Sequence, residues 1–493
     1  SFGLATGAVQ LVIHCVDPAS PAPSAPFTNW TTAAAQIQDA IDAAHDGEFV
    51  LVTNGVYSVG GRVMAGDLTN RVVVPKAATL CSLNGRGVTT IQGAWDPVTT
   101  NGPLAVRALW LGGGATACGF RIVGGATRNT GNTTLMQTGG GIWCAGSNCF
   151  VLDCDIIGNG AAADGGGGYL GAFNRCRILS NTSVSGGGVY LAAVANSLIQ
   201  SNVAQSGGGV SACALSNCTV VGNVGLNNFF SAGSGMNSTI ARNSIIYNNT
   251  GAPNWGGFGI QTSTNCCTIP AIVGTGNMTN DPQVLDGFHL AITSPCRGAG
   301  NPLFVSGVDL DGEPWTNPPS MGCDEVWEAA LTGPLSVTAS APWASIAAGG
   351  TLPVTGTVAG KASRVAWDFG DGSALTNASY VSTSHFYTNS GDYTVTFTAF
   401  NIDNPGGVST NLTVHVVPFV VPSLAAGGFV GLGTFSLTFT GQPGITYVTE
   451  TATNLTPPVS WIPLSTVTSP SGLVQVTDSK ATNQAQFYRI RTQ

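Results

Sequence analysis

The sequence predicts an all-β protein in which a parallel β-helix with an N-terminal capping helix precedes two immunoglobulin-like β-sandwich domains. Three observations lead to this prediction. A six-residue motif ending in asparagine recurs five times between residues 154 and 249, at steps of 21 or 22 residues with one step of 26. A helical pattern with one apolar face lies ahead of these repeats. Beyond Cys323 the cysteines end and alternating β segments take over. Repeats of this period are typical of solenoids.

The N-terminal residues predict a cap that covers the first coil of the β-helix. Residues 8–16 indicate a strand, and residues 31–44 indicate a helix with alanine and isoleucine on one face. Such a helix would cover the open end of the solenoid, whose first coil otherwise exposes unpaired strand edges. We expect the coils to begin at Phe49 and to run to about residue 290, which places the β-helix domain at residues 1–328.

Residues at equivalent positions of successive repeats should lie directly above one another, at the inter-strand spacing of about 4.8 Å. One such row is apolar and should point into the core: Ile156, Ile178, Ile199, Val220 and Ile246. A second row lies at a bend, where asparagine amides should bond along the stack. It comprises Asn159, Asn181, Asn202, Asn223 and Asn249. Glycine clusters ahead of four motifs permit the sharp turns that such coils need.

Two acidic residues of one repeat should face two arginines of the next. In the predicted register Asp153 lies above Arg175, and Asp155 lies above Arg177. We interpret both as surface ion pairs, each contributing under about 1 kcal/mol.

Composition argues against several classes of protein. The 493 residues are enough for two to four domains, but only 8% of them are charged and the net charge is −8. Lysine occurs only three times and no basic patch is present, so we expect no nucleic-acid binding. No stretch has the length and hydrophobicity of a transmembrane segment. The chain begins at Ser1 rather than Met, as after removal of a signal peptide or after truncation, and we expect an extracellular location.

The thirteen cysteines allow several interpretations. Equal spacing suggests short-loop disulfides, and a longer one could join the last two cysteines; the candidate pairs are Cys144 with Cys149, Cys213 with Cys218, and Cys296 with Cys323. Cys154 and Cys176 occupy one row on adjacent coils, where a disulfide would also fit. The alternative is that these cysteines are small buried apolar residues. An odd number leaves at least one thiol unpaired or linking two chains.

Two groups of motifs resemble a known family. Residues 37–44 and 50–57 resemble the opening of pectin-lyase-like proteins, which are right-handed parallel β-helices. Residues 281–290, 294–300 and 309–325 resemble the closing segment of the secreted bacterial subgroup called choice-of-anchor Q. Together the resemblance covers residues 8–326. It implies a right-handed coil for this domain and says little about activity.

The C-terminal third resembles two further modules. Trp367-Asp-Phe-Gly-Asp-Gly372, followed by His385 and by residues 391–398, is similar to a PKD domain, and we expect it to span residues 329–417. The resemblance implies that Trp367 fills the core of an immunoglobulin-like sandwich. Residues 418–493 alternate in polarity over three short segments, which predicts a small C-terminal β-sandwich module.

The sequence predicts no catalytic residue. Pectin-lyase-like folds often cut acidic polysaccharides, which requires clustered carboxylates on adjacent coils. Between residues 139 and 250 the only acidic residues are Asp153, Asp155 and Asp164. A denser acidic group near the end of the β-helix includes Asp309, Asp311 and Glu313, which are candidate calcium ligands or, alternatively, turn residues.

Aromatic residues follow the glycine clusters on neighbouring coils. Trp143, Tyr169 and Tyr190 would stack on sugar rings or on a partner subunit if exposed, or would pack along one face of the coils if covered. The sequence leaves these alternatives open.

The leading functional hypothesis is a non-enzymatic, secreted bacterial surface protein that assembles with identical copies into a filament or serves in adhesion. Sparse charge, which removes repulsion between copies, supports it. Residues 1–7 and the C-terminal sandwich are candidates for head-to-tail contacts. The alternatives are a polysaccharide lyase or glycoside hydrolase acting on acidic polysaccharide, and an adhesin that binds extracellular glycans. No cofactor is expected apart from the candidate calcium.

Overall fold

The computed structural model describes residues 11–227, 232–257, 262–378, 381–431, 433–469, 472–481 and 485–493. The chain divides into two compact units, Ser1–Trp327 and Glu328–Gln493. Helices are few and short among these residues: α1 (Ile37–Ala43), α2 (Thr133–Met136) and the 3-10 helices η1 (Trp30–Thr32), η2 (Pro302–Phe304) and η3 (Glu328–Ala330). None of the helices in the described part of the chain has the length and hydrophobicity needed to cross a lipid bilayer.

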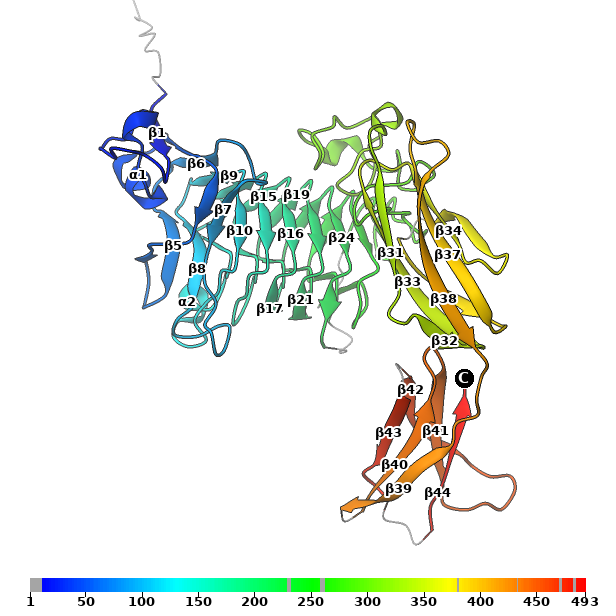
Figure 1. Cartoon of the computed structure of the whole chain (residues 1–493). Coiled ribbons are helices and arrows are strands. Elements are labelled where there is room, and N and C mark those ends of the chain that lie inside the picture. The colour runs from blue at the N-terminus through cyan, green and yellow to red at the C-terminus, as the bar shows by residue number, and fades with distance from the viewer. Residues whose placement is uncertain are drawn as a thin grey trace, which may run out of the picture. The chain divides into compact units, whose positions relative to one another are not determined.

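The first unit is a parallel β-helix, as predicted, and its described coils form three nine-stranded sheets (Figure 1). Sheet A consists of β1 (Ile13–Val16), β2 (Phe49–Val52), β6 (Thr79–Ser82), β9 (Thr116–Cys118), β12 (Phe150–Leu152), β15 (Ala172–Asn174), β19 (Ala193–Ala195), β23 (Ala214–Ser216) and β27 (Ile240–Arg242). Sheet B consists of β3 (Gly55–Tyr57), β7 (Thr89–Gln92), β10 (Arg121–Val123), β13 (Asp155–Ile157), β16 (Arg177–Leu179), β20 (Leu198–Gln200), β24 (Thr219–Val221), β28 (Ile245–Tyr247) and β30 (Cys267–Thr268).

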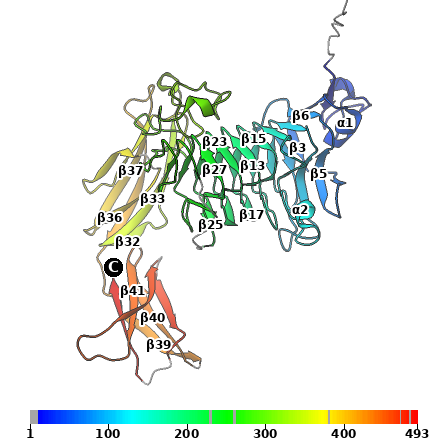
Figure 2. The same cartoon turned by 180° about the vertical axis from the view of Figure 1, so that it is seen from behind.

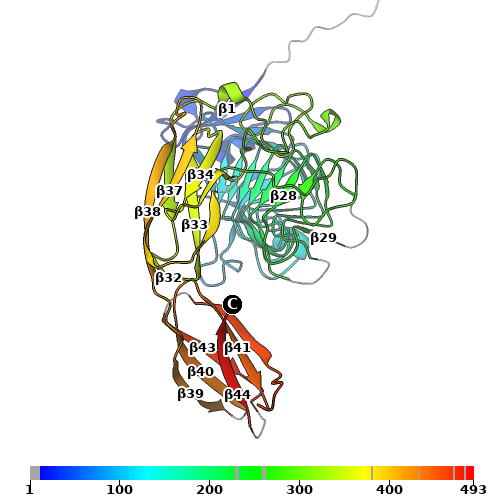
Figure 3. The same cartoon turned by 90° about the vertical axis from the view of Figure 1, so that its right-hand side faces the viewer.

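Sheet C is the third sheet of the β-helix, and its strand β5 is labelled in Figure 2. It consists of β4 (Arg62–Val63), β5 (Thr69–Val74), β8 (Val106–Leu111), β11 (Ile142–Cys144), β14 (Gly168–Tyr169), β18 (Val189–Tyr190), β22 (Val210–Ser211), β26 (Met236–Asn237) and β29 (Trp255–Gly256). A three-stranded sheet adds β17 (Thr182–Ser185), β21 (Val203–Ser206) and β25 (Val224–Gly225). Figure 3 turns the last coils, with β28 and β29, toward the viewer. The pairing is parallel throughout sheets A and B, whereas β4 and β5 of sheet C pair antiparallel.

The apolar row predicted from the sequence lies on the buried face of sheet B, which points into the core. Ile156 is the register partner of Ile178, which is followed by Ile199, Val220 and Ile246, and all five are completely buried. The row extends two coils further toward the N-terminus, to Ile122 and Ile91. Stacking one β-branched residue on another fills the narrow interior because each coil repeats the shape of the coil before it.

The asparagine amides form a continuous chain of hydrogen bonds between coils. Asn181 Nδ2 donates to Asn202 Oδ1 at 2.9 Å, and Asn202 Nδ2 donates to Asn223 Oδ1 at 2.9 Å. The same contact joins Asn159 to Asn181 and Asn223 to Asn249. The chain extends one step further than the sequence motif, because Asn249 Nδ2 donates to Asn254 Oδ1 at 2.8 Å.

The glycine clusters lie where successive coils touch backbone to backbone. A Cβ atom on Gly188 would lie 2.6 Å from the carbonyl oxygen of Gly209, and one on Gly167 would lie 2.6 Å from that of Gly188. Any side chain there would force the coils apart, so the clusters set the close approach as well as the turn.

The capping helix is shorter than predicted. Helix α1 begins at Ile37 rather than at residue 31, because the 3-10 helix η1 ends at Thr32 and Ala34 then pairs with β1, its N donating to Cys15 O at 2.9 Å. Ile37, Ala40 and Ile41 are buried against the first coil, as a plug requires. The predicted strand at residues 8–16 is observed as β1, Ile13–Val16, and residues 8–10 lie outside the described residues, as do residues 1–7.

All thirteen cysteines are free thiols in this structure, so the expected disulfides are absent. Cys144 does hydrogen-bond Cys149. In contrast, Cys213 Sγ donates to Ser211 O and Cys218 Sγ donates to Val194 O. The contacts of Cys296 and Cys323 do not support their pairing. Cys296 forms a hydrogen bond with the thiol of Cys267, and Cys323 forms one with Thr219. All of the cysteines except Cys81 and Cys118 are buried, which agrees with the alternative that they serve as small apolar residues.

The second unit contains two β-sandwiches. In the first, β31 (Ser336–Ser340), β33 (Gly350–Ala359) and β36 (Ser382–Tyr387) form one sheet, and β32 (Ser345–Ala347), β38 (Val408–Val417), β37 (Gly391–Phe400), β34 (Arg364–Asp368) and β35 (Ala374–Ala378) form the other. Trp367 is 1% exposed and packs on Phe397 with ring centroids 4.5 Å apart. In the second sandwich, β39 (Leu424–Gly431), β40 (Thr434–Gly441) and β43 (Gly472–Asp478) form one sheet, and β42 (Ile462–Thr468), β41 (Thr446–Ala452) and β44 (Phe487–Thr492) form the other.

Candidate functional site

The acidic residues near the end of the β-helix lie in a segment that folds back over sheet B. This closing segment, residues 281–325, covers the outward side chains of the later coils. Cys323 N donates to Thr219 Oγ1 at 3.1 Å, and Asn196 Nδ2 donates to Ser306 O at 3.1 Å. The closing segment and sheet B also share a small apolar cluster. It contains Leu198 and Val221 from the sheet and Leu310 and Cys323 from the segment. Carboxylates distant in sequence are therefore brought together on the sheet.

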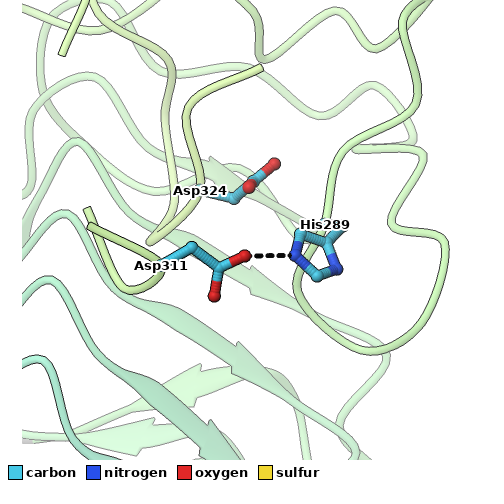
Figure 4. A group of neighbouring side chains, drawn as sticks. All are labelled: His289, Asp311 and Asp324. Atoms are coloured by element: carbon cyan, nitrogen blue, oxygen red, sulfur yellow. Dashed lines mark hydrogen bonds and ion pairs between the residues drawn. The ribbon is translucent and has the colours of Figure 1, made fainter. Parts of the chain in front are cut away.

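His289 is at the centre of the charged group (Figure 4). Its Nδ1 lies 2.6 Å from Asp286 Oδ2, and its Nε2 lies 2.8 Å from Asp311 Oδ2. Burial alone would lower the pKa of His289, but the hydrogen bonds to Asp286 and Asp311 outweigh it and raise the pKa to about 11. The ring is therefore an imidazolium ion bound on both sides, which ties the turn at Asp311 to the loop at Asp286.

Asp324 lies beside this group but is 4% exposed. Its Oδ2 accepts a hydrogen bond from Leu290 N at 2.9 Å. Burial raises its pKa to about 7, although the positive charge of His289 opposes the shift. A carboxyl group with such a pKa suits general acid or base chemistry. Its burial keeps it from the glycosidic bonds of a polymer.

Asp309 organises the tight turn that presents Asp311. Its Oδ1 accepts from Asp311 N at 3.0 Å and from Glu313 N at 2.7 Å, and its Oδ2 accepts from Glu325 N at 3.0 Å. Glu325 in turn accepts from Ser320 N and Ser320 Oγ, each at 2.8 Å. This is the turn role that the sequence offered as the alternative to calcium binding.

The structure divides the candidate calcium ligands into two overlapping groups. Asp309 and Glu313 lie with Asp324, whereas Asp311 lies with His289 and Asp324; within each group the ligand atoms are within 4.8 Å of one another. Calcium prefers six to eight oxygen ligands. The three backbone amides bound to Asp309 and the imidazolium bound to Asp311 already compensate much of the negative charge that would hold such an ion.

Two arginine–aspartate pairs continue the charged surface on the neighbouring coils. Arg177 Nε and Nη2 donate to Asp155 at 2.8 and 2.7 Å, in the predicted register, and Arg86 Nε lies 3.4 Å from the same carboxylate. Asp155 is only 2% exposed, so its carboxylate is buried beneath two partly exposed arginines rather than lying in the surface pair we expected. Arg175 Nε donates to Asp153 Oδ1 at 2.7 Å in the pair that does remain at the surface.

Sequence reasoning placed Asp309, Asp311 and Glu313 in one group and left out the residues that bind them. Asp286, His289 and Arg86 were missed. His289 follows Asp286 by three residues, which is a usable signal for a local pair, but no spacing signal connects it to Asp311. The cluster exists because the closing segment doubles back, and a repeat pattern does not reveal such a fold.

Four aromatic residues of sheet C form a row in which each ring stacks on the ring of the next coil. Trp110, Trp143, Tyr169 and Tyr190 are consecutive register neighbours with ring centroids 5.5, 6.3 and 6.1 Å apart. Trp143 is 7% exposed and Tyr169 is 8% exposed. Sugar rings stack on free aromatic faces, so the packing alternative accounts for these residues better than glycan stacking does.

Comparison with protein families identifies one module of the second unit. A family model described as the PKD domain matches residues 335–416, the region of the first sandwich. This sandwich is a PKD domain. Its Trp367 occupies the core position that the resemblance implied. No curated protein matches the chain.

Several solved structures show detectable similarity to parts of this chain. Pectate lyase Pel9A has a TM-score of 0.39 at 12% identity, covering 64% of this chain and 96% of that one. Pectin methylesterase PemA from Erwinia chrysanthemi has a TM-score of 0.29 at 13% identity, covering 54% and 82%. Fibronectin(III)-like modules of Clostridium thermocellum CbhA have a TM-score of 0.17 at 20% identity, covering 28% and 77%.

Proposed function

We propose that this protein is a non-enzymatic extracellular structural protein that assembles with identical copies into a filament. The observation that carries the proposal is the way in which the carboxylates of the candidate site are used. Asp286 and Asp311 bind the His289 imidazolium, Asp309 binds three backbone amides, and Asp155 binds two arginines. Each contact fastens the closing segment or a coil, and the carboxyl group with the most suitable pKa, Asp324, is buried.

A structural role also accounts for the rest of the chain. The coils are joined by uninterrupted amide hydrogen bonds, which favours a stiff scaffold, and charge is sparse enough that copies repel one another little. PKD-like modules commonly serve as spacers or contact units in secreted proteins, which fits the proposed location outside the cell.

Electron microscopy and enzyme assays test this proposal together. The purified chain should form filaments as its concentration is raised. It should release neither unsaturated uronate nor reducing ends from polygalacturonate or alginate, with or without calcium. Polymer cleavage that is abolished in Asp324→Asn or His289→Asn would replace the proposal with a lyase or hydrolase function.

A second candidate function is adhesion to acidic glycans. Arg121 is exposed in the same register row as Asp155 and Arg177, and it forms no ion pair within the described residues. The preceding coil carries Arg86, whose guanidinium contacts Asp155. Guanidinium groups bind carboxylates and sulfates well. Binding of polygalacturonate or heparin that is weakened at least tenfold in Arg121→Ala would support this role.

A further inference from the structure

Strand β39 of the C-terminal sandwich differs from every other strand of that module. All eight of its residues are exposed, with Leu424 at 66%, Phe429 at 70% and Val430 at 66%. A strand in a sandwich normally buries alternate side chains. Strand β43, at the other edge of the same sheet, does so, since Val474, Val476 and Asp478 are buried. Both faces of β39 are therefore largely uncovered within the described residues, and the ring of Phe429 contacts only that of its register partner Phe435 among the described rings.

The backbone of β39 is also open. Among the described strands it pairs only with β40, so the polar groups along its other edge are available for another strand. The preceding residues Phe419, Val420 and Val421 extend the exposed apolar surface. No charged side chain occurs between Asp403 and Glu450. Natural proteins usually protect such an edge with charges or prolines, so an unprotected apolar edge marks a docking surface.

We propose that β39 accepts residues 1–10 of a second copy of the chain as an added strand. This inference rests on the proposed function and names the contact that would build the filament. The segment Ser-Phe-Gly-Leu-Ala-Thr-Gly-Ala-Val-Gln places Phe2 and Leu4 on one side of an extended chain, and no charged side chain occurs before Asp17. Ten extended residues span about 33 Å, enough to pair with all eight residues of β39, which span about 27 Å.

The donor is a second copy because the proposed filament joins identical chains through a contact that does not close on itself. Added strands of this kind obtain affinity from main-chain hydrogen bonds and specificity from alternate side chains.

Three full-length variants test the contact. Phe429→Lys places a charge on the acceptor strand, Leu4→Lys places one on the donor segment, and Leu473→Lys is the matched control on β43, where Leu473 is 67% exposed. We expect the wild type and Leu473→Lys to form filaments in electron micrographs. Phe429→Lys and Leu4→Lys should stay dispersed with unchanged circular dichroism. Normal filaments from Phe429→Lys would overturn the proposal.

A labelled peptide of residues 1–10 separates this contact from the filament itself. Added to the Leu4→Lys chain, it should bind, and introducing Phe429→Lys as well should weaken binding at least tenfold. If the wild type never assembles but this pattern of peptide binding holds, the filament function fails and the strand acceptor stands. If the peptide binds both chains equally or neither, β39 is not its acceptor, even where filaments form.

Discussion

At the scale of single residues, the asparagine row shows how one side chain can serve two coils. Asn202 Oδ1 accepts from both Asn181 N and Asn181 Nδ2 at 2.9 Å, and Asn202 Nδ2 donates to Ile178 O at 2.9 Å. The side chain is completely buried. Because the bend is buried, removing the amide would take a hydrogen-bond partner from three buried polar groups of the preceding coil, of which Asn181 Nδ2 keeps a second bond to Ile156 O.

Replacing Asn202 by alanine should therefore lower the free energy of unfolding by about 3 kcal/mol, through unsatisfied polar groups rather than lost volume. Chemical denaturation of the β-helix unit measures this loss. Gln205→Ala, an exposed position on the same coil, is the control and should change stability by less than about 0.5 kcal/mol. Equal stability of the two variants would contradict the role assigned to the row.

His289 should make stability depend on pH. Its pKa is about 11 in the folded chain and about 6.5 when unfolded. Because the folded value is higher, the stabilisation is complete below about pH 6.5 and is lost as the pH rises toward 11. His289→Asn should lower stability at neutral pH by about 2 kcal/mol and flatten its decline between about pH 7 and pH 10. Urea denaturation across this range measures the slope, and an unchanged slope in His289→Asn would contradict this role of the ring.

At the scale of elements, the closing segment is the part of the β-helix held by the most varied contacts. One of them joins the thiol of Cys296 to that of Cys267 on β30, the last strand of sheet B. A small-molecule disulfide such as oxidised glutathione can convert this pair to a disulfide by two exchange steps, with release of two molecules of thiol.

We expect the oxidised chain to contain a Cys267–Cys296 crosslink and to gain about 3 kcal/mol of stability. Peptide mapping without reductant identifies which cysteines are crosslinked. The crosslink should be lost in Cys296→Ser and kept in Cys323→Ser, which distinguishes it from the Cys296–Cys323 disulfide expected from the sequence. A Cys296–Cys323 peptide would contradict the contacts described above.

The repeating elements could be predicted from the sequence, whereas the elements that break the repeat could not. The row from Ile156 to Ile246 and the asparagine row follow from a period, because equal spacing places like residues one above another. Helix α1 begins later than its apolar pattern suggested, because the backbone of Ala34 pairs with β1. The charged cluster was not predicted, because His289 contacts Asp311 only when the closing segment folds back over sheet B. No local sequence pattern indicates that the chain folds back in this way.

At the scale of the whole molecule, the chain combines two stabilising strategies. The β-helix repeats one coil and relies on contacts between neighbours, whereas each sandwich relies on a central core. The two units are compact by themselves. We therefore expect two separate thermal transitions rather than one.

Trp367→Ala tests this independence. Trp367 is the largest completely buried side chain of the PKD domain, packed against Phe369 and Phe397, and its removal should cost about 3–5 kcal/mol. In calorimetry the transition of the second unit should fall by several degrees, while that of the β-helix should stay within error of the wild type. Asn202→Ala should have the reverse effect, because its hydrogen bonds lie wholly within the coils. If either substitution moved both transitions together, the two units would have to unfold as one cooperative body, and the β-helix would depend on the sandwiches for its stability.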